Sequence, residues 1–255
     1  MKLIMLGSGT STGVPRVGND WGECDPQEPR NRRSRVSIIV QNGAGQRILV
    51  DTSTDLRAQL LATNIPKVDA VFWTHDHADH CHGIDDLRVM RYDRSNPLPG
   101  IASRVTCERL RRRFDYVFEG QFGYPTIVEL RECSQVQLVA GFSFDSVEMP
   151  HGPVKSTGFR FEADGKSIVY ATDFSEITPA MIQCFRSCDL LVVDCLRERP
   201  HPTHAHLDMA LDLARRCKAK RTVLTHLDKS MDYATIGGKI PKDVAVGFDG
   251  MEVSL

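Results

Sequence analysis

The most constraining feature of this sequence is a cluster of metal-ligand residue types directly after an apolar run. Residues 69–73 have the pattern of a buried β-strand, and Thr74 follows them. Four potential ligands come next within six positions: His75, His77, Asp79 and His80. Loops at the carboxyl ends of strands are where α/β proteins commonly place functional residues. Imidazole and carboxylate groups suit zinc, iron or manganese, so we interpret the cluster as a metal site. The alternative is an exposed turn that is rich in histidine.

The spacing within this cluster predicts two metal ions rather than one. Four ligands from so short a segment are more than one ion normally takes. We therefore assign His75 and His77 to one ion, and Asp79 and His80 to the other.

Three more potential ligands each follow a strand-like apolar run further along the chain: His151, Asp173 and His226. Taken singly, a histidine at a strand end is more often structural. The repeated order of apolar strand, small residue and then His or Asp nevertheless predicts that these side chains meet the first cluster at one edge of the sheets.

Length and composition are those of one ordinary domain. The chain has 255 residues, 41% of them hydrophobic, which suits a single α/β domain over residues 1–255. The formal net charge of −1 gives no indication of nucleic-acid or membrane partners, and the arginine-rich run 109–113 is interpreted as a solvated face. Residues 1–6 are too short for a signal-peptide core or a membrane span. Eight scattered cysteines without a C-x-x-C pair fit a reducing cytoplasm.

Strand patterns dominate both halves of the chain. We expect strands at residues 2–6, 36–40, 46–50, 69–73, 136–139, 143–148, 157–162, 167–170, 190–193 and 221–225. We expect helices at residues 54–62 and 206–217. Between residues 84 and 125 the pattern is unclear, apart from a short helix capped by Thr106 and reaching Arg113. Strands followed by alternating elements predict sheets with helices packed outside.

The ordered ligand set resembles the metallo-β-lactamase superfamily over the whole of residues 1–255. The segment Gly-Ser-Gly-Thr-Ser at residues 7–11 is similar to the branch that contains phosphodiesterases and tRNA 3′-processing nucleases. Within that branch, residues 7–15, 31–33 and 248–250 are most similar to the phosphoribosyl cyclic phosphate phosphodiesterases of the C–P lyase pathway. The resemblance implies an αββα sandwich.

The resemblance also implies a role for each predicted ligand. One metal ion would be held by His75, His77 and His151. The other would be held by Asp79, His80 and His226. Asp173 would bridge the two ions, which would be zinc or manganese, and a hydroxide between them would attack the phosphorus of a phosphodiester.

A second group of residues is predicted to assist the reaction. His204 is the candidate that protonates the leaving oxygen, although His201 and His206 compete for this role and His204 alternatively caps the following helix. Asp79 is included in the catalytic set. Asp51 is expected beneath the metals as an acceptor for a ligand imidazole, or alternatively as the N-cap of the helix near residue 54.

Substrate contacts are predicted from residues rich in phosphate-binding groups. The loop with Ser8, Thr10 and Ser11 could present backbone N–H groups to a phosphate, or form a structural turn. Arg32 and Arg33 match phosphate oxygens by paired hydrogen bonds. His201 is added to this set.

Close relatives often carry a further structural zinc near the position of Cys24. Here Cys24 has no neighbouring cysteine, Gly22 lies where a partner could be, and Lys229 replaces the histidine of the relatives. We therefore predict no third zinc.

The leading functional hypothesis is a phosphodiesterase for a small, cyclic or nucleotide-like phosphodiester. A tRNA 3′-processing endonuclease shares the ligand set, but the chain shows no long Gly/Pro-rich insertion and no basic net charge. A non-catalytic metal or nucleotide sensor is the alternative of another class, and the complete ligand set argues against it. A homodimer is compatible with a domain of this size.

Overall fold

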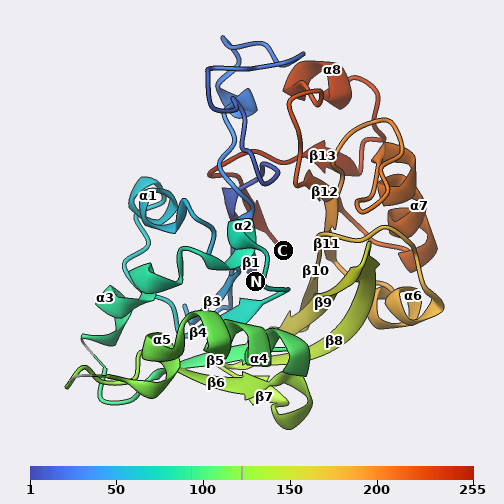
Figure 1. Ribbon diagram of the computed structural model, residues 1–255. Helices are drawn as coiled ribbons and strands as arrows, with labels where there is room; N and C mark the ends of the chain where they lie inside the picture. Colours follow the sequence, from blue (N-terminus) through green and yellow to red (C-terminus); the bar gives the residue numbers. More distant parts are fainter. Residues whose placement is uncertain (93, 122) are drawn as a thin grey trace.

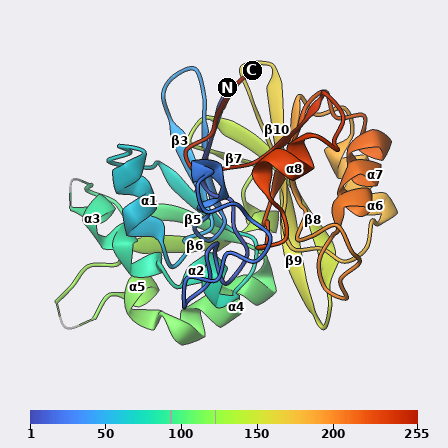
Figure 2. The ribbon, with the colours of Figure 1, turned by 90° about the horizontal axis from the view of Figure 1, so that it is seen from above.

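The first half of the chain and the C-terminal strand build one β-sheet, the rest of the second half builds another, and the two sheets pack face to face with helices on both outer faces (Figures 1 and 2). The computed structural model describes residues 1–92, 94–121 and 123–255. The first sheet has the order β14 (Glu252–Ser254), β1 (Lys2–Gly7), β2 (Ser37–Gln41), β3 (Arg47–Val50), β4 (Ala70–Trp73), β5 (Leu98–Ala102) and β6 (Val128–Glu132). The second has the order β13 (Val244–Val246), β12 (Thr222–Thr225), β11 (Leu190–Asp194), β10 (Lys166–Ala171), β9 (Val154–Ala163), β8 (Phe142–His151) and β7 (Leu138–Val139). This is the expected αββα sandwich.

Helices cover the two outer faces of the sandwich. Those of the first half are α1 (Leu56–Ala62), α2 (Ala78–Cys81), α3 (Leu87–Arg91), α4 (Arg104–Arg113) and α5 (Asp115–Glu119). Those of the second half are α6 (Pro179–Phe185), α7 (Leu207–Cys217) and α8 (Tyr233–Gly237). No helix in the described ranges combines the length and the apolar character that a membrane crossing needs.

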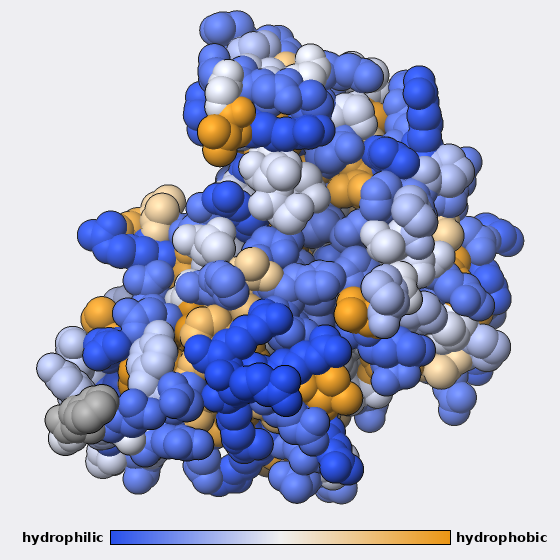
Figure 3. Space-filling model, in the orientation of Figure 1, coloured by the Kyte–Doolittle hydropathy of each residue, from blue (hydrophilic) through white to orange (hydrophobic). Residues whose placement is uncertain are grey.

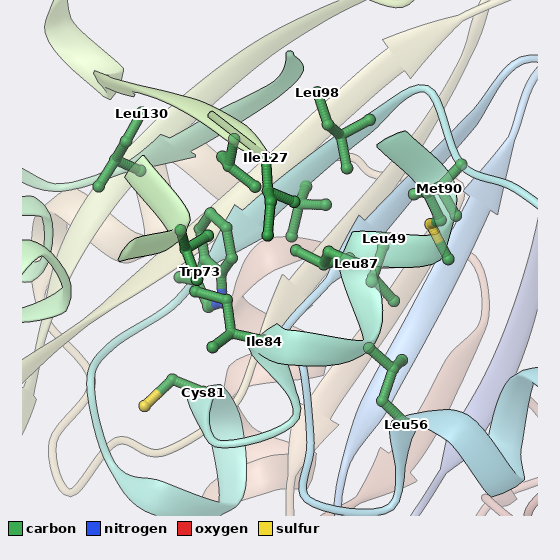
Figure 4. Close-up of a cluster of buried hydrophobic side chains, with 14 of the residues drawn as sticks. Leu49, Leu56, Trp73, Cys81, Ile84, Leu87, Met90, Leu98, Ile127 and Leu130 are labelled. Carbon is green, nitrogen blue, oxygen red and sulfur yellow. The ribbon is translucent and has the colours of Figure 1, made fainter. Parts of the chain in front are cut away.

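Three apolar clusters hold these layers together. Phe72 in β4 and Phe159 and Phe161 in β9 pack edge to face or stacked between the two sheets, with ring centroids 5.0 to 5.8 Å apart. Trp73, the neighbour of Phe72, points to the opposite face and packs under the first-half helices (Figure 4). This alternation within one strand shows why the apolar run predicted a strand buried on both faces.

The strand directions bring the predicted site residues to one edge. Strands β3 to β6 run parallel, and so do β10 to β13. Strand β8 is antiparallel to β9, which is antiparallel to β10, so β8 and β10 end on the same side. The carboxyl ends of β4, β8, β10, β11 and β12 therefore face one region, which holds the candidate site.

Several sequence expectations need correction. The helix expected to begin at Thr106 begins at Arg104, because Ser103 is its N-cap and accepts the backbone N–H of Thr106. Helix α1 begins at Leu56 rather than at residue 54. The expected strand 136–139 shrinks to the two residues of β7. The short elements β5, β6, β13, β14, α3, α5, α6 and α8 had not been predicted.

Candidate metal centre

Seven side chains converge at the carboxyl ends of the strands. His75 and His77 follow β4, while Asp79 and His80 lie in the short helix α2. The other three come from the second sheet: His151 ends β8, Asp173 follows β10, and His226 follows β12. The structure thus brings together every metal ligand that the sequence predicted.

The carboxylate of Asp173 lies between two groups of these residues. Its Oδ2 is 3.8 Å from Nε2 of His75 and 3.5 Å from Nε2 of His151. Its Oδ1 is 3.3 Å from Nε2 of His80 and 3.7 Å from Nε2 of His226. Each oxygen therefore faces one group, which is the arrangement expected of a bridging ligand.

The remaining contacts complete the two groups. Nδ1 of His77 is 3.3 Å from Nε2 of His151. Oδ2 of Asp79 is 3.5 Å from Nε2 of His80 and 3.6 Å from Nε2 of His226. Within each group the potential ligand atoms lie within 4.8 Å of one another. Asp173, His204 and His226 form a third, overlapping set of this kind.

Buried nitrogens without partners show that the site suits cations. Nε2 of His75, His80 and His226 is buried and has no hydrogen-bond partner among the described residues. A buried polar atom without a partner costs free energy, and three such atoms aimed at one point favour a ligand that accepts their lone pairs. Mixed nitrogen and oxygen donors suit zinc and manganese, so these residues fit two divalent ions.

Electrostatics favour neutral imidazoles at His75 and His151, and charged side chains at His226 and Asp173. Burial holds the pKa of His75 well below its ordinary value and lowers that of His151. Burial also opposes the charged form of His226, but Asp173 and other carboxylates outweigh it and raise its pKa to about 10. Similarly, His226 and His80 keep the pKa of Asp173 well below its usual range despite burial. The site carries a surplus of negative carboxylate charge, and bound cations would offset it.

Asp51 lies beneath the predicted ligand His80. Its Oδ2 is 2.8 Å from Nδ1 of His80, and the same carboxylate accepts the backbone N–H and the hydroxyl of Thr74. An acceptor at this position would fix which ring nitrogen faces a metal ion. The alternative role as a helix cap falls to Asp55, which is the N-cap residue of α1.

Three of the site residues adopt left-handed backbone conformations. Asp51, Asp173 and His226 have φ values of 64°, 59° and 60°. Non-glycine residues seldom adopt such values, and when they do they are found preferentially at functional sites. Asp51 and His226 directly follow a strand and Asp173 follows one after a single intervening residue, so the turn aims each side chain across the sheet edge.

Asp194 is a site residue that the sequence analysis missed. It ends β11, is fully buried, and its Oδ2 lies 3.2 Å from Nδ1 of His204. Its Oδ1 lies 3.6 Å from Nδ1 of His226, and neither atom has a hydrogen-bond partner in the part of the chain that the structure describes. The sequence does contain a signal for Asp194, because an aspartate after an apolar run is the same pattern that identified Asp51 and Asp173.

The three competing histidines occupy different positions. Nδ1 of His204 is 3.7 Å from Oδ2 of Asp173, and its ring stacks on that of His226 with centroids 4.7 Å apart. His201 lies further out, with its ring centroid 5.2 Å from that of His204 and its Nδ1 accepting the backbone N–H of Thr203. His206 is the N-cap residue of α7. Of the three histidines, His204 lies nearest the predicted metal ligands, so the geometry favours it as the candidate proton donor.

The N-terminal loop supports the site from behind. The N–H and hydroxyl of Ser8 both donate to Asp249, and its carbonyl accepts the N–H of Leu227. Thr10 donates its N–H to the carbonyl of Leu227 in return, whereas Ser11 is exposed. Since Leu227 follows His226, the loop fixes that ligand. For Ser8, which is buried, the alternative of a structural turn is the one that the geometry favours.

Arg33 does not have the position expected of a substrate contact. Its side chain is 2% exposed and donates to the carbonyls of Asp228 and Met231, so we correct its assignment to a structural one. Arg32 stacks on Trp21, with 5.1 Å between the guanidinium carbon and the ring centroid, and lines a separate cavity of about 570 Å³.

Other contacts occupy the position considered for a third zinc. Cys24 is buried, and Nη1 of Arg33 lies 3.8 Å from its Sγ. Nζ of Lys229 lies 2.6 Å from Oδ2 of Asp20. Gly22 has φ 57°, and a Cβ built there would lie 2.7 Å from the Lys229 side chain.

Comparisons with known proteins agree with this geometry. Residues 46–227 match the family described as "Beta-lactamase superfamily domain". A crystal structure of a diphosphatase from the PhnP family is 36% identical, with a TM-score of 0.88 over 99% of this chain and 96% of that one. The expected similarity to the C–P lyase phosphodiesterase branch is thereby confirmed.

Curated relatives carry different names. An octanoyltransferase of Porphyromonas gingivalis is 33% identical over 261 residues, which are 99% of this chain and 51% of the relative. A ribonuclease Z of Bradyrhizobium sp. is 30% identical over 138 residues, which are 52% of this chain and 46% of the relative. The chain thus spans about half the length of these curated relatives.

Proposed function

Because this chain belongs to the beta-lactamase superfamily, we propose that it is a metal-dependent hydrolase, and more specifically a dinuclear phosphodiesterase acting on a small phosphodiester. The observation that carries this proposal is the position of Asp173, whose two oxygens face two separate groups of ligands while His204 lies beside them. The similarity to a PhnP-family diphosphatase supports phosphoester chemistry.

The residues divide into two ion-binding sets. His75, His77 and His151 would hold one ion, with Oδ2 of Asp173. The second ion would be held by a set that shares Oδ1 of Asp173: Asp79, His80 and His226. When bound, two divalent ions supply Lewis-acid activation of water and neutralise phosphate charge.

The protein's own groups prepare the leaving oxygen. Asp194 accepts from Nδ1 of His204, which fixes the orientation of the ring and leaves Nε2 free to hold a proton toward the substrate. Asp51 orients His80 in the same way from the other side. The chain thus positions both the ligands and the acid through buried carboxylates.

A ribonuclease that trims tRNA 3′ ends is the second candidate, favoured by the match to ribonuclease Z. Octanoyl transfer is less compatible with the site. The match covers only 51% of that relative, and Cys81, the thiol next to the predicted ligand His80, is fully buried and so not accessible as the nucleophile that acyl transfer needs. We also infer that the protein belongs to a reducing compartment, since all eight cysteines are free thiols. The expected homodimer stays a prediction.

The decisive experiment offers zinc-, manganese- or cobalt-loaded protein a generic phosphodiester, bis(p-nitrophenyl) phosphate, beside a precursor tRNA with a 3′ trailer. We expect metal-dependent hydrolysis of the small diester, and loss of that hydrolysis in Asp173→Ala. Efficient trimming of the tRNA with slow hydrolysis of the small diester would support the ribonuclease instead. Protein that retains both ions and hydrolyses neither would support the non-catalytic sensor.

A further inference from the structure

We propose that the cavity between α4 and the β8–β9 hairpin binds a second anionic group of the substrate, with Arg109 as its main contact. The inference rests on the proposed function, because it concerns the substrate of the same centre. The cavity has a volume of about 450 Å³. Its lining includes α4 residues on one side and hairpin residues on the other: Arg104, Thr106, Arg109, Ser146, Lys155 and Thr157.

This cavity adjoins the metal centre through Asp76. Asp76 lines the cavity and lies in the chain between the predicted ligands His75 and His77. The backbone N–H of Thr157, in the opposite wall, donates to the carbonyl of Thr74 at 2.9 Å. The proposal therefore places the phosphodiester of the substrate at the metal centre and one of its substituents beyond Asp76, in this space.

Two arginines of α4 share the one carboxylate of Asp76. Nη1 of Arg109 lies 2.9 Å from Oδ1, and Nη2 of Arg113 lies 2.9 Å from Oδ2. Asp76 is buried, with 6% of its side chain exposed, whereas the Arg109 side chain is 44% exposed. Two positive charges on one negative charge leave a surplus of one. Arg113 alone is enough to satisfy Asp76, so Arg109 can serve a second anion.

The guanidinium of Arg109 has the geometry for this task. Only Nη1 has a hydrogen-bond contact, to Asp76, among the described residues. The remaining N–H groups of a guanidinium form a planar fork that pairs with two oxygens of a phosphate or carboxylate. Because Arg109 lines the cavity, those groups are accessible to a ligand in it.

The other charges of the lining limit the ligand to one additional negative charge. Arg104 and Lys155 are paired with Glu108 and Glu148 at exposed positions, and Glu132 also lines the cavity. A long polyanion such as RNA would meet these carboxylates. Figure 3 shows the strongly hydrophilic surface over α4, next to the hairpin. A diphosphate or a carboxylate-bearing phosphodiester fits this balance better.

The test compares two substrates in three matched variants. Bis(p-nitrophenyl) phosphate carries one negative charge, and ADP-ribose, a diphosphate diester, carries two. Arg109→Gln should raise KM for ADP-ribose about tenfold, the cost expected for one charge-assisted hydrogen bond, and leave KM for the aryl diester within about twofold. Arg113→Gln removes the other cation of Asp76 without removing a group that lines the cavity. Arg109 must then satisfy Asp76 alone, so KM for ADP-ribose should again rise more than KM for the aryl diester.

Further controls separate this inference from the proposed function. Arg112→Gln removes an exposed charge from the same helix and should change neither KM. Equal effects of Arg109→Gln on both substrates would overturn the inference, while hydrolysis of the aryl diester by the parent protein would still support the phosphodiesterase. If the parent hydrolyses neither substrate, calorimetric titration of ADP-ribose into metal-free protein measures whether Arg109 contributes to its binding. Weaker binding in Arg109→Gln than in Arg112→Gln supports the inference, and equal affinity in the parent protein, Arg109→Gln and Arg112→Gln overturns it.

Discussion

Oδ2 of Asp194 lies 3.2 Å from Nδ1 of His204, and the other oxygen of this carboxylate faces Nδ1 of His226 at 3.6 Å. One buried side chain therefore orients both the candidate proton donor and a predicted metal ligand. The backbone N–H groups of Phe174 and Ala205 also donate to Oδ2, so the carboxylate itself is held in place. One carboxylate thus couples the position of the candidate proton donor to that of a predicted metal ligand.

Replacing Asp194 should impair both parts. We expect Asp194→Asn to lower kcat about 10- to 100-fold, the usual effect of removing an acceptor behind a ligand imidazole. Metal content of the purified variant should fall as well, because His226 loses its orienting partner. Steady-state kinetics with metal analysis would measure both effects, and Asp212→Asn on the exposed face of α7 serves as the control. Unchanged kcat and metal content would contradict the linkage.

His204 should matter most where the leaving group is poor. We expect His204→Ala to lower turnover of a dialkyl phosphodiester, whose leaving alkoxide needs a proton, about 10²- to 10⁴-fold. Turnover of bis(p-nitrophenyl) phosphate should fall far less, because p-nitrophenolate needs no proton. Metal content should be retained. His201→Ala and His206→Ala are the matched comparisons, since neither histidine contacts Asp194. The assignment fails if His204→Ala slows both substrates by the same factor.

Removing metal should destabilise the fold. The buried Nε2 atoms of His75, His80 and His226 lose their intended partners, so we expect a chelator to abolish activity and to lower Tm. At a free-metal concentration one hundredfold above Kd, each ion contributes about 2.7 kcal/mol. Metal analysis should give two ions per chain. Three ions would contradict the interpretation of the Lys229–Asp20 contact as a replacement for a structural zinc.

The convergence of the seven predicted ligands could be anticipated from the sequence, because each lies at or shortly after the end of a recognisable strand. In contiguous segments such as residues 69–80, the apolar run and the ligand spacing are visible without tertiary information. Parallel strand pairing then brings separate strand ends together, which is a general property of such sheets and needs no knowledge of this chain.

Residues whose roles depend on distant partners were not predictable in the same way. Arg33 has the chemistry of a phosphate ligand, and only the fold shows that its guanidinium lies against the carbonyls of Asp228 and Met231. The short elements around α3 and α5 depend on packing against Trp73 and its neighbours rather than on local pattern (Figure 4). Asp194 had a local signal, but its role became visible only through His204.

Asp249 provides a test of the loop behind the site. Its buried carboxylate accepts the backbone N–H and hydroxyl of both Ser8 and Ser34, and burial raises its pKa. Asp249→Ala leaves two backbone donors without partners, so we expect a loss of about 3 kcal/mol in the free energy of unfolding. Urea denaturation measures this, with the exposed Asp243→Ala as the control. A loss below about 0.5 kcal/mol would mean that water replaces the carboxylate.

Asp232 gives a pH dependence to the anchoring of the N-terminal segment. Its carboxylate accepts from Thr235, Asn31 and the N–H of Asp25. Burial alone would raise its pKa, but these hydrogen bonds outweigh burial and lower it from 3.8 to about 2. Because the folded-state pKa lies below the unfolded value, the stabilisation is complete above about pH 4 and is lost as pH falls toward about 2.

The difference in unfolding free energy between the parent protein and Asp232→Asn isolates this contribution. This difference should be constant from about pH 7 to pH 5 and should shrink progressively as the pH falls from about 4 to 3. It shrinks because protonation of Asp232 in the parent protein removes the stabilisation that the variant lacks at every pH. Urea unfolding at each pH measures it, with Asp243→Asn as the control for loss of an exposed charge. A difference that stays constant down to about pH 3 would show that the anchoring does not depend on the charge of Asp232.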